Sequence, residues 1–113
     1  MSDTVRPRDR ARAFTPHLAD LVDDPLFAQV WERPGLSKRD RSLITVAAIV
    51  ALHRPEVLPA HLLRARENGV TSQELSEAIT HLAFYAGFPS AISASAIAAE
   101  TLGPLDEGAA SPR

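Results

Sequence analysis

The chain has 113 residues, of which 45% are hydrophobic and 23% charged, and its formal net charge at pH 7 is -2. This balance is ordinary for one small soluble domain and leaves no global attraction to a nucleic-acid backbone, so we expect no nucleic-acid partner. Because the chain has no cysteine, a disulfide framework, a thiolate metal site and thiol catalysis are all excluded.

The first 14 residues are expected to form a mobile basic arm, because Arg6, Arg8, Arg10 and Arg12 alternate through them without apolar periodicity. No apolar run is long enough for a signal-peptide core or a membrane span. We therefore expect no membrane partner and a cytoplasmic location.

The remaining chain is predicted to be helical. Apolar residues recur at spacings of three and four, and no alternating pattern typical of a strand is found. An all-α fold of about six helices is expected, with a single helical domain at 15–102 and a disordered tail at 103–113. Thr15 and Pro16 suit the start of the first helix, and Asp24 with the following proline interrupts it.

A central helix is predicted from about Ser37 to His53. From Leu43 to Leu52 only Thr45 is polar, so the helix is apolar almost all round. A domain this small can bury such a helix only at its centre or against another subunit.

Three further helices follow, and glycines, prolines and a capping box mark their ends. Thr71 and Glu74 have the spacing of a capping box, and Gly69 and Gly87 suit left-handed helix ends. The expected ranges run from between Pro55 and Pro59 to Asn68, from Ser72 to Ala86, and from Pro89 to Leu102.

Glu77, His81 and Tyr85 lie four residues apart in the helix that starts at Ser72. This spacing places them on one stripe, which fits two interpretations. They form either a solvated edge, in which Glu77 pairs with His81, or one wall of a site with acid-base groups.

Other candidates are His61, which precedes two leucines, and the pair Arg39 and Arg41, which lies in the first turn of the central helix. An arginine there can be a solvated helix start or can bind a carboxylate through its planar fork. The histidines lack the helical spacing of a zinc motif, so we expect no metal site.

The segments WERPGLSKRDRSLITVAAIVAL and PAHLLRARENGVTSQELSEAITHLAFYAGFP occur in an order that resembles the carboxymuconolactone decarboxylase family. The resemblance spans roughly residues 26–99. It implies an alkylhydroperoxidase-like helical fold, no cofactor, and homo-oligomers such as trimers or hexamers with the site near subunit contacts. In the thiol-using branch two cysteines stand where this chain has Arg54 and Val57, so peroxidase activity is excluded.

The resemblance implies a cytoplasmic carboxy-lyase that acts on a carboxylated unsaturated lactone, 4-carboxymuconolactone or a related cyclic acid, in aromatic-compound catabolism (the β-ketoadipate pathway). The implied site residues have five roles. They are His61 or His81 as the acid-base group, Tyr85 as hydrogen-bond donor, Glu77 as orienter of His81, Arg41 and less surely Arg39 as carboxylate clamp, and Trp31 with Phe88 as apolar walls.

Two other classes of function fit the same residues. One is a non-catalytic oligomeric protein that holds a small acidic ligand in the same pocket, and the other is a structural partner of another enzyme. A catalyst needs a titrating group and forms a product, whereas a binding protein does not.

Overall fold

The computed structural model describes residues 7–105, and every regular element in this range is a helix. The all-α prediction is therefore confirmed. The chain divides into two compact units, residues 1–38 and residues 39–113, which are described separately below. Most of the predicted tail lies outside the described residues. No helix in the described range is long and apolar enough to cross a membrane.

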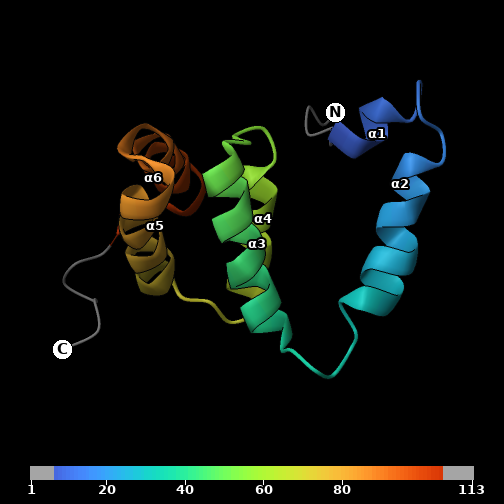
Figure 1. The fold of residues 1–113 in the computed structure, drawn as a ribbon, viewed down its shortest axis with the longest axis horizontal. Helices are drawn as coiled ribbons and strands as arrows, with labels where there is room; N and C mark the ends of the chain where they lie inside the picture. The colour runs from blue at the N-terminus through green and yellow to red at the C-terminus, as the bar shows by residue number, and fades with distance from the viewer. Residues whose placement is uncertain (1–6, 106–113) are drawn as a thin grey trace. The chain divides into compact units, whose positions relative to one another are not determined.

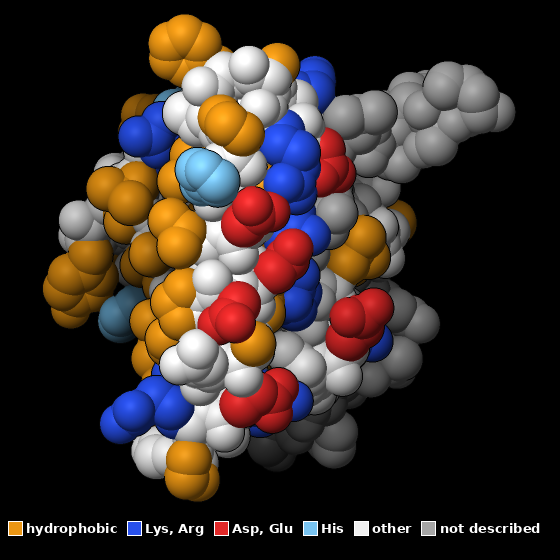
Figure 2. All heavy atoms as spheres, turned by 90° about the vertical axis from the view of Figure 1, so that its right-hand side faces the viewer, with side chains coloured by type: hydrophobic (Ala, Val, Ile, Leu, Met, Phe, Trp, Pro, Cys, Tyr) orange, Lys and Arg blue, Asp and Glu red, His pale blue; other side chains and the backbone are white. Residues whose placement is uncertain are grey.

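The N-terminal unit contains three short elements, α1 (Pro7–Ala11), α2 (Leu18–Leu21) and η1 (Val22–Val30) (Figure 1). The helix α1 lies within the segment expected to be an arm. Two arginines of this segment form ion pairs with later carboxylates, Arg8 with Asp23 and Arg12 with Asp20, each at 2.8 Å. Figure 2 shows basic and acidic side chains side by side on this unit.

The break predicted at Asp24 and Pro25 is present in η1. Asp24 has φ -149° and ψ 116°, which is extended rather than helical backbone. Proline supplies no N–H to an intrahelical hydrogen bond, so a helix that reaches Pro25 must restart there. The side-chain amide of Gln29 donates to Asp24 Oδ1 at 2.7 Å and ties the two sides of the break together.

The C-terminal unit is built from four helices, and α6 packs against both α4 and α5. Each boundary falls within one or two residues of the sequence prediction. The helices are α3 (Lys38–Leu52), α4 (Leu58–Glu67), α5 (Ser72–Ala86) and α6 (Phe88–Leu102).

The predicted helix ends are confirmed by their hydrogen bonds and backbone angles. Thr71 Oγ1 accepts from the Glu74 N–H at 3.0 Å, and Glu74 Oε1 accepts from the Thr71 N–H at 2.9 Å. This reciprocal pair satisfies two N–H groups that a helix start otherwise leaves open. Gly69 and Gly87 both have φ 102°, a value that favours glycine.

The core of this unit lies where the four helices meet. Leu62 and Val46 are completely buried, and Leu75 is 1% exposed. The cluster around them is made of aliphatic side chains and alanines: Val50, Leu58, Ala65, Val70, Ile79, Ala83, Ala91 and Ala94.

The helix α3 buries only one stripe in this core, although it is apolar almost all round. Ser42, Val46 and Val50 face inward, whereas Ile44 is 57% and Leu52 is 69% exposed. Within the C-terminal unit, α3 is therefore buried along one side only. Burial of its outer side against another subunit stays a prediction.

The adjacent residues Leu62 and Leu63 give a matched test of this core. Leu62→Ala removes a completely buried side chain and is expected to lower the free energy of unfolding by about 2 to 5 kcal/mol. Leu63 is 49% exposed, so Leu63→Ala should cost well under half as much. Urea denaturation of both variants measures the difference. Equal losses would contradict the position of α4 in the fold.

Candidate active site

Glu77, His81 and Tyr85 share one stripe of α5, as their spacing predicts, and this stripe is exposed in the structure. The rings of His81 and Tyr85 are 4.9 Å apart between centroids and inclined by 31°. No ion pair joins Glu77 to His81 within residues 7–105, and Tyr85 is 78% exposed. In a single chain the stripe is therefore an open row of polar groups rather than the wall of a closed pocket.

His61 has a different environment, because it is half-buried on α4 between inward-facing leucines. Burial lowers the pKa of His61 below its ordinary value of 6.5, and the nearby positive charge of Arg64 lowers the pKa further. His61 is consequently neutral at pH 7. A neutral imidazole can accept a proton or donate a hydrogen bond at the same pH.

The guanidinium of Arg39, a predicted carboxylate clamp, contacts two carboxylates of the protein. It donates to Glu74 at the start of α5 and to Asp40 Oδ1 at 3.2 Å. The Glu74 pKa lies below its ordinary value, first because the Thr71 N–H donates to its carboxylate and then because Arg39 does. Arg39 thus links α3 to the capping box of α5, and a substrate carboxylate would have to compete with Glu74.

Arg41, the other predicted clamp, is half-buried in the first turns of α3, and its carbonyl accepts a hydrogen bond from Thr45 Oγ1 at 2.7 Å. At the next residue, the hydroxyl of the buried Ser42 accepts from Asn68 Nδ2 at 2.9 Å. These contacts hold the start of α3 against the turn between α4 and α5. The backbone that carries Arg41 is therefore held in place by two part-buried hydrogen bonds.

The two predicted apolar walls belong to different units. Trp31 is buried in the N-terminal unit, with its ring centroid 5.5 Å from that of Phe27. Phe88 opens α6 in the C-terminal unit and makes an edge-to-face contact with Phe84 at 5.3 Å. The structure brings His81 together with Tyr85, and it does not gather the eight predicted residues around one cavity of a single unit.

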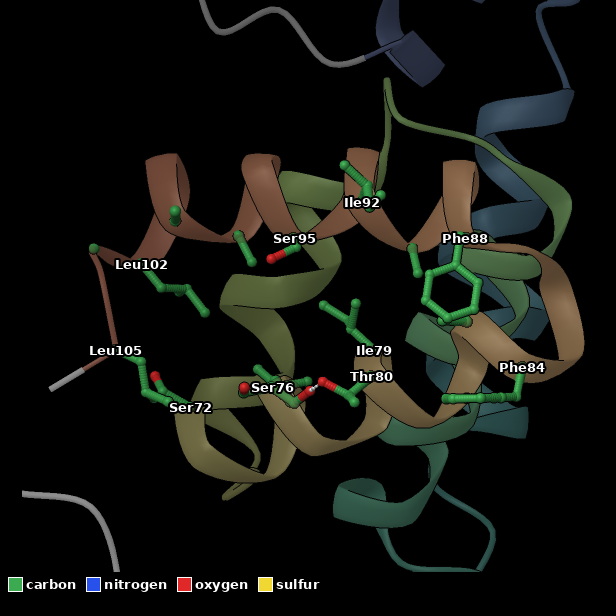
Figure 3. A pocket seen from close by; sticks show the side chains of 16 residues that line it. Ser72, Ser76, Ile79, Thr80, Phe84, Phe88, Ile92, Ser95, Leu102 and Leu105 are labelled. Atoms are coloured by element: carbon green, nitrogen blue, oxygen red, sulfur yellow. Dashed lines mark hydrogen bonds between the residues drawn. The ribbon is translucent and has the colours of Figure 1, made fainter. Parts of the chain in front are cut away.

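The C-terminal unit has a groove between α5 and α6 with a volume of about 320 Å³ (Figure 3). Phe84 and Phe88 line one end of the groove, and Leu102 and Leu105 line the other. Its polar lining consists of Ser and Thr hydroxyls, and no charged side chain takes part. Of the predicted site residues only Phe88 lines it, so the groove suits apolar groups rather than a carboxylate.

The groove was not predicted from the sequence, although the small residues of α6 indicate that space is available along this helix. Ala91, Ser95, Ala98 and Ala99 leave little side-chain bulk along the helix, and all four line the cavity. A row of small residues permits close approach of a neighbour or leaves a channel. Only the packing of α5 against α6 decides between these outcomes.

A second and much smaller cavity, of about 10 Å³, lies between the end of α3 and α6. His53 and Arg54 line it together with the hydroxyls of Ser90 and Ser93. His53 has φ 56°, a left-handed conformation that is uncommon for residues other than glycine. Arg54, which the sequence indicated only as a position that lacks cysteine, is here a cationic residue at the edge of a mostly apolar cavity about the size of a water molecule.

No group of three or more His, Asp or Glu side chains in residues 7–105 is placed so that it could hold a metal ion. The predicted polar site residues are histidines, a phenol, arginines and a carboxylate. These groups can bind an anion, donate hydrogen bonds and move protons.

The lowered pKa of His61 predicts a pH dependence of folding. Well above pH 6.5 His61 is neutral in the folded and the unfolded chain, so its titration does not change stability there. As the pH falls through 6.5 the unfolded chain takes up the proton first, and the free energy of unfolding falls. Wild type should lose more free energy of unfolding than His61→Gln between about pH 7.5 and about pH 5.5.

Two-dimensional NMR titration provides the direct control for this prediction. The His61 midpoint should lie below 6.5, and Arg64→Gln should raise it only part of the way, because burial is the larger cause. A midpoint at or above 6.5 in the wild type would contradict the half-buried position of the ring.

Comparison with known proteins assigns these features to a family. The description "Carboxymuconolactone decarboxylase family" belongs to the family model that matches residues 16–100. The 4-carboxymuconolactone decarboxylase of Acinetobacter baylyi is 36% identical over 100 residues, which cover 88% of this chain and 75% of that protein. The nitrosuccinic acid decarboxylase of Metarhizium robertsii is 36% identical over 99 residues, which cover 87% of this chain and 69% of that protein. Because the match extends from before α2 into the last turns of α6, the chain belongs to the carboxymuconolactone decarboxylase family.

Proposed function

We propose that this chain is a cofactor-independent carboxy-lyase that decarboxylates a carboxylated unsaturated lactone, 4-carboxymuconolactone or a related cyclic acid, in aromatic-compound catabolism. The observation that carries the proposal is the 36% identity, over 88% of the chain, to a 4-carboxymuconolactone decarboxylase. The second relative, named a nitrosuccinic acid decarboxylase, supports decarboxylation as the shared reaction class.

The compounds in the two relatives' names share a chemical feature. Both compounds carry a carboxylate on a skeleton with an electron-withdrawing group, the conjugated lactone carbonyl in one and the nitro group in the other. When the bond to the carboxylate breaks, carbon dioxide leaves and the electron pair moves into that group. An enzyme for such a reaction needs to stabilise the resulting anion and then to protonate carbon.

The residues of this chain supply groups for each step. Arg41 binds the substrate carboxylate, and the Tyr85 hydroxyl donates to the lactone oxygen on which negative charge develops. A histidine then protonates the carbanion to give the enol-lactone, either His61 on α4 or His81, which Glu77 orients. No oxidation or reduction occurs, so the reaction balances without a cofactor.

Arg41 is the first assignment for the clamp and Arg39 the second, as the family resemblance implies. Arg39 already donates hydrogen bonds to Glu74 and Asp40, so a substrate carboxylate would have to displace them. Trp31 and Phe88 are assigned to apolar walls that exclude water.

A homo-oligomer, a trimer or hexamer, is part of the proposal. His81 and Tyr85 are exposed in a single chain, whereas stabilisation of an anion by hydrogen bonds is strongest where water is excluded. The exposed outer side of α3 supports an assembly, because Ile44 and Leu52 remain in water when the chain is alone. A neighbouring subunit would cover such surfaces and close the site. The protein is expected to act in the cytoplasm.

The proposal is tested with purified protein and 4-carboxymuconolactone, by following carbon dioxide release and the loss of the conjugated lactone absorbance. His61→Ala and His81→Ala are each made, and the variant that removes the acid-base group should lower kcat by about 10² to 10⁴-fold. Tyr85→Phe should lower kcat more moderately, because it removes one hydrogen bond to the developing anion.

His17→Ala is the matched control, because the His17 side chain is 92% exposed and belongs to the other unit. It should leave turnover unchanged. Full turnover in both His61→Ala and His81→Ala would remove histidine from the mechanism. Binding of the lactone without carbon dioxide release would favour the alternative, a non-catalytic protein that holds a small acidic ligand.

A further inference from the structure

The turn between α4 and α5 contains the only asparagine of the chain, Asn68, which is directly followed by Gly69 (Figure 1). Asparagine before glycine is the pair most prone to spontaneous deamidation, because glycine has no side chain that hinders attack by its backbone nitrogen. Asn68 is partly buried and Gly69 is exposed, so water reaches the turn. The proposed decarboxylase site makes no use of this pair.

Deamidation of this pair needs no reagent other than water. The backbone nitrogen of Gly69 attacks the side-chain carbon Cγ of Asn68, the bond from Cγ to Nδ2 breaks, and ammonia leaves with the proton that the Gly69 nitrogen gives up. Water then opens the cyclic succinimide at either carbonyl. One opening gives aspartate, and the other gives isoaspartate, whose main chain runs through the former side chain. Nothing is oxidised or reduced.

The backbone of Asn68 does not have the geometry that this attack requires. In the cyclic succinimide the Gly69 nitrogen is eclipsed with Cβ of Asn68 about the Cα–C bond. Asn68 has φ -87° and ψ 7°, and at a ψ near zero the Gly69 nitrogen is eclipsed with the Asn68 nitrogen instead. The reaction therefore requires rotation about this bond, which moves Gly69 out of its present position.

Backbone hydrogen bonds of the turn oppose that rotation. The Gly69 N–H donates to the carbonyl of Arg66 at 3.1 Å, and the Val70 N–H donates to the carbonyl of Ala65 at 2.9 Å. The Arg66 guanidinium in turn donates to the Val70 carbonyl at 3.0 Å. These contacts fix the nucleophilic nitrogen and the residue that follows it.

The side chain of Asn68 is held as well. Its Nδ2 donates to the hydroxyl of Ser42 at 2.9 Å, and Ser42 is 2% exposed. This bond fixes the carbon that would be attacked, from a different helix. We propose that Asn68 is a site of covalent modification, converted to aspartate or isoaspartate when the turn opens, and that the bond to Ser42 and the bonds of the turn keep this reaction slow in the folded chain.

Conversion of the amide to a carboxylate would loosen the turn. A carboxylate cannot donate to the Ser42 hydroxyl, and it adds a negative charge at the C-terminal end of α4, where the helix dipole opposes anions. The start of α3, whose backbone carries Arg41, would lose one of its two part-buried hydrogen bonds. The inference is independent of the proposed function, because it rests on the turn alone.

The reaction is followed by incubating the folded protein, and the same protein unfolded in urea, at mildly alkaline pH. Peptide mass spectrometry reports the conversion of Asn68, and enzymatic methylation reports isoaspartate. Opening of the turn breaks three hydrogen bonds, those donated by Asn68 Nδ2, Gly69 and Val70. The folded chain should therefore react more slowly than the unfolded chain by on the order of 100-fold.

Two variants loosen the turn from different sides. Ser42→Ala removes the acceptor of the Asn68 amide and should speed deamidation of the folded chain by about 2- to 10-fold, the factor that corresponds to one hydrogen bond. Arg66→Ala removes the bond to the Val70 carbonyl and should act in the same direction. Because Arg66 is exposed, its variant decides the question even where Ser42→Ala does not fold.

Leu63→Ala is the matched control, because Leu63 lies on α4, is 49% exposed and makes none of these hydrogen bonds. It should leave the rate unchanged. Asn68→Asp reproduces one product directly and should lower Tm by about 4 °C or more, since it replaces a donor by a charge at the helix end. An unchanged Tm would contradict the loosening of the turn.

Faster deamidation in Ser42→Ala and Arg66→Ala, with Leu63→Ala unchanged, supports the inference. The contribution of global unfolding is the unfolded fraction from urea denaturation multiplied by the rate of the unfolded chain. A rate equal to this product in every variant would show that the local bonds play no part, which overturns the inference. Equal rates in the folded and unfolded chain, or no conversion of Asn68 in urea, overturn it too.

Discussion

The C-terminal unit depends on one constraint, which is that four helices share a core too small to cover all their apolar side chains. Leu62, Val46 and Leu75 fill the centre, and each helix contributes only one stripe to it. The apolar residues that remain must face either water or another protein. Their exposure at Ile44 and Leu52 on α3, and at Phe84 and Phe88 where α5 meets α6, follows directly from the size of the chain.

Polar contacts between helix ends complement this core. Glu74 accepts hydrogen bonds from the Thr71 N–H and from Arg39, so one carboxylate starts α5 and holds the first turn of α3 beside it. The part-buried bond between Ser42 and Asn68 joins α3 to the end of α4. Because the bonds that Arg39 and Asn68 donate between helices are partly buried and directional, they select one register among the several that apolar stripes alone would permit.

Some of these features could be predicted from the sequence, and others could not. The ends of α4, α5 and α6 were predictable, because glycine, proline and the Thr71–Glu74 box act within a few residues. The partner of Arg39 could not be predicted, because Glu74 is 35 positions away and no local sequence pattern indicates the contact. The helix α1 was missed for the same reason, because Arg8 and Arg12 pair with acids of later elements.

Some features of the candidate site could likewise be predicted from the sequence, and others could not. The ring contact between His81 and Tyr85 follows from their four-residue spacing on α5. The half-burial of His61 depends on how α4 packs, and the cavity beside His53 and Arg54 depends on how the turn after α3 meets α6. Spacing within one helix thus predicts which side chains share a face, while burial and charge environment come from contacts between helices.

The lowered pKa of His61 has a consequence for the division of labour between the two histidines. A neutral imidazole is a poor source of the proton that the carbanion needs, and Arg64 adds to the cost of charging it. A substrate carboxylate bound nearby would oppose both effects, because a negative charge within about 4 to 6 Å favours the protonated ring. If His61 is the proton donor, the carboxylate of the bound substrate supplies the negative charge that favours the protonated form of His61. If His81 is the proton donor, Glu77 is the nearest carboxylate in sequence that can favour the protonated form of His81. The substrate carboxylate can then be bound by the arginines.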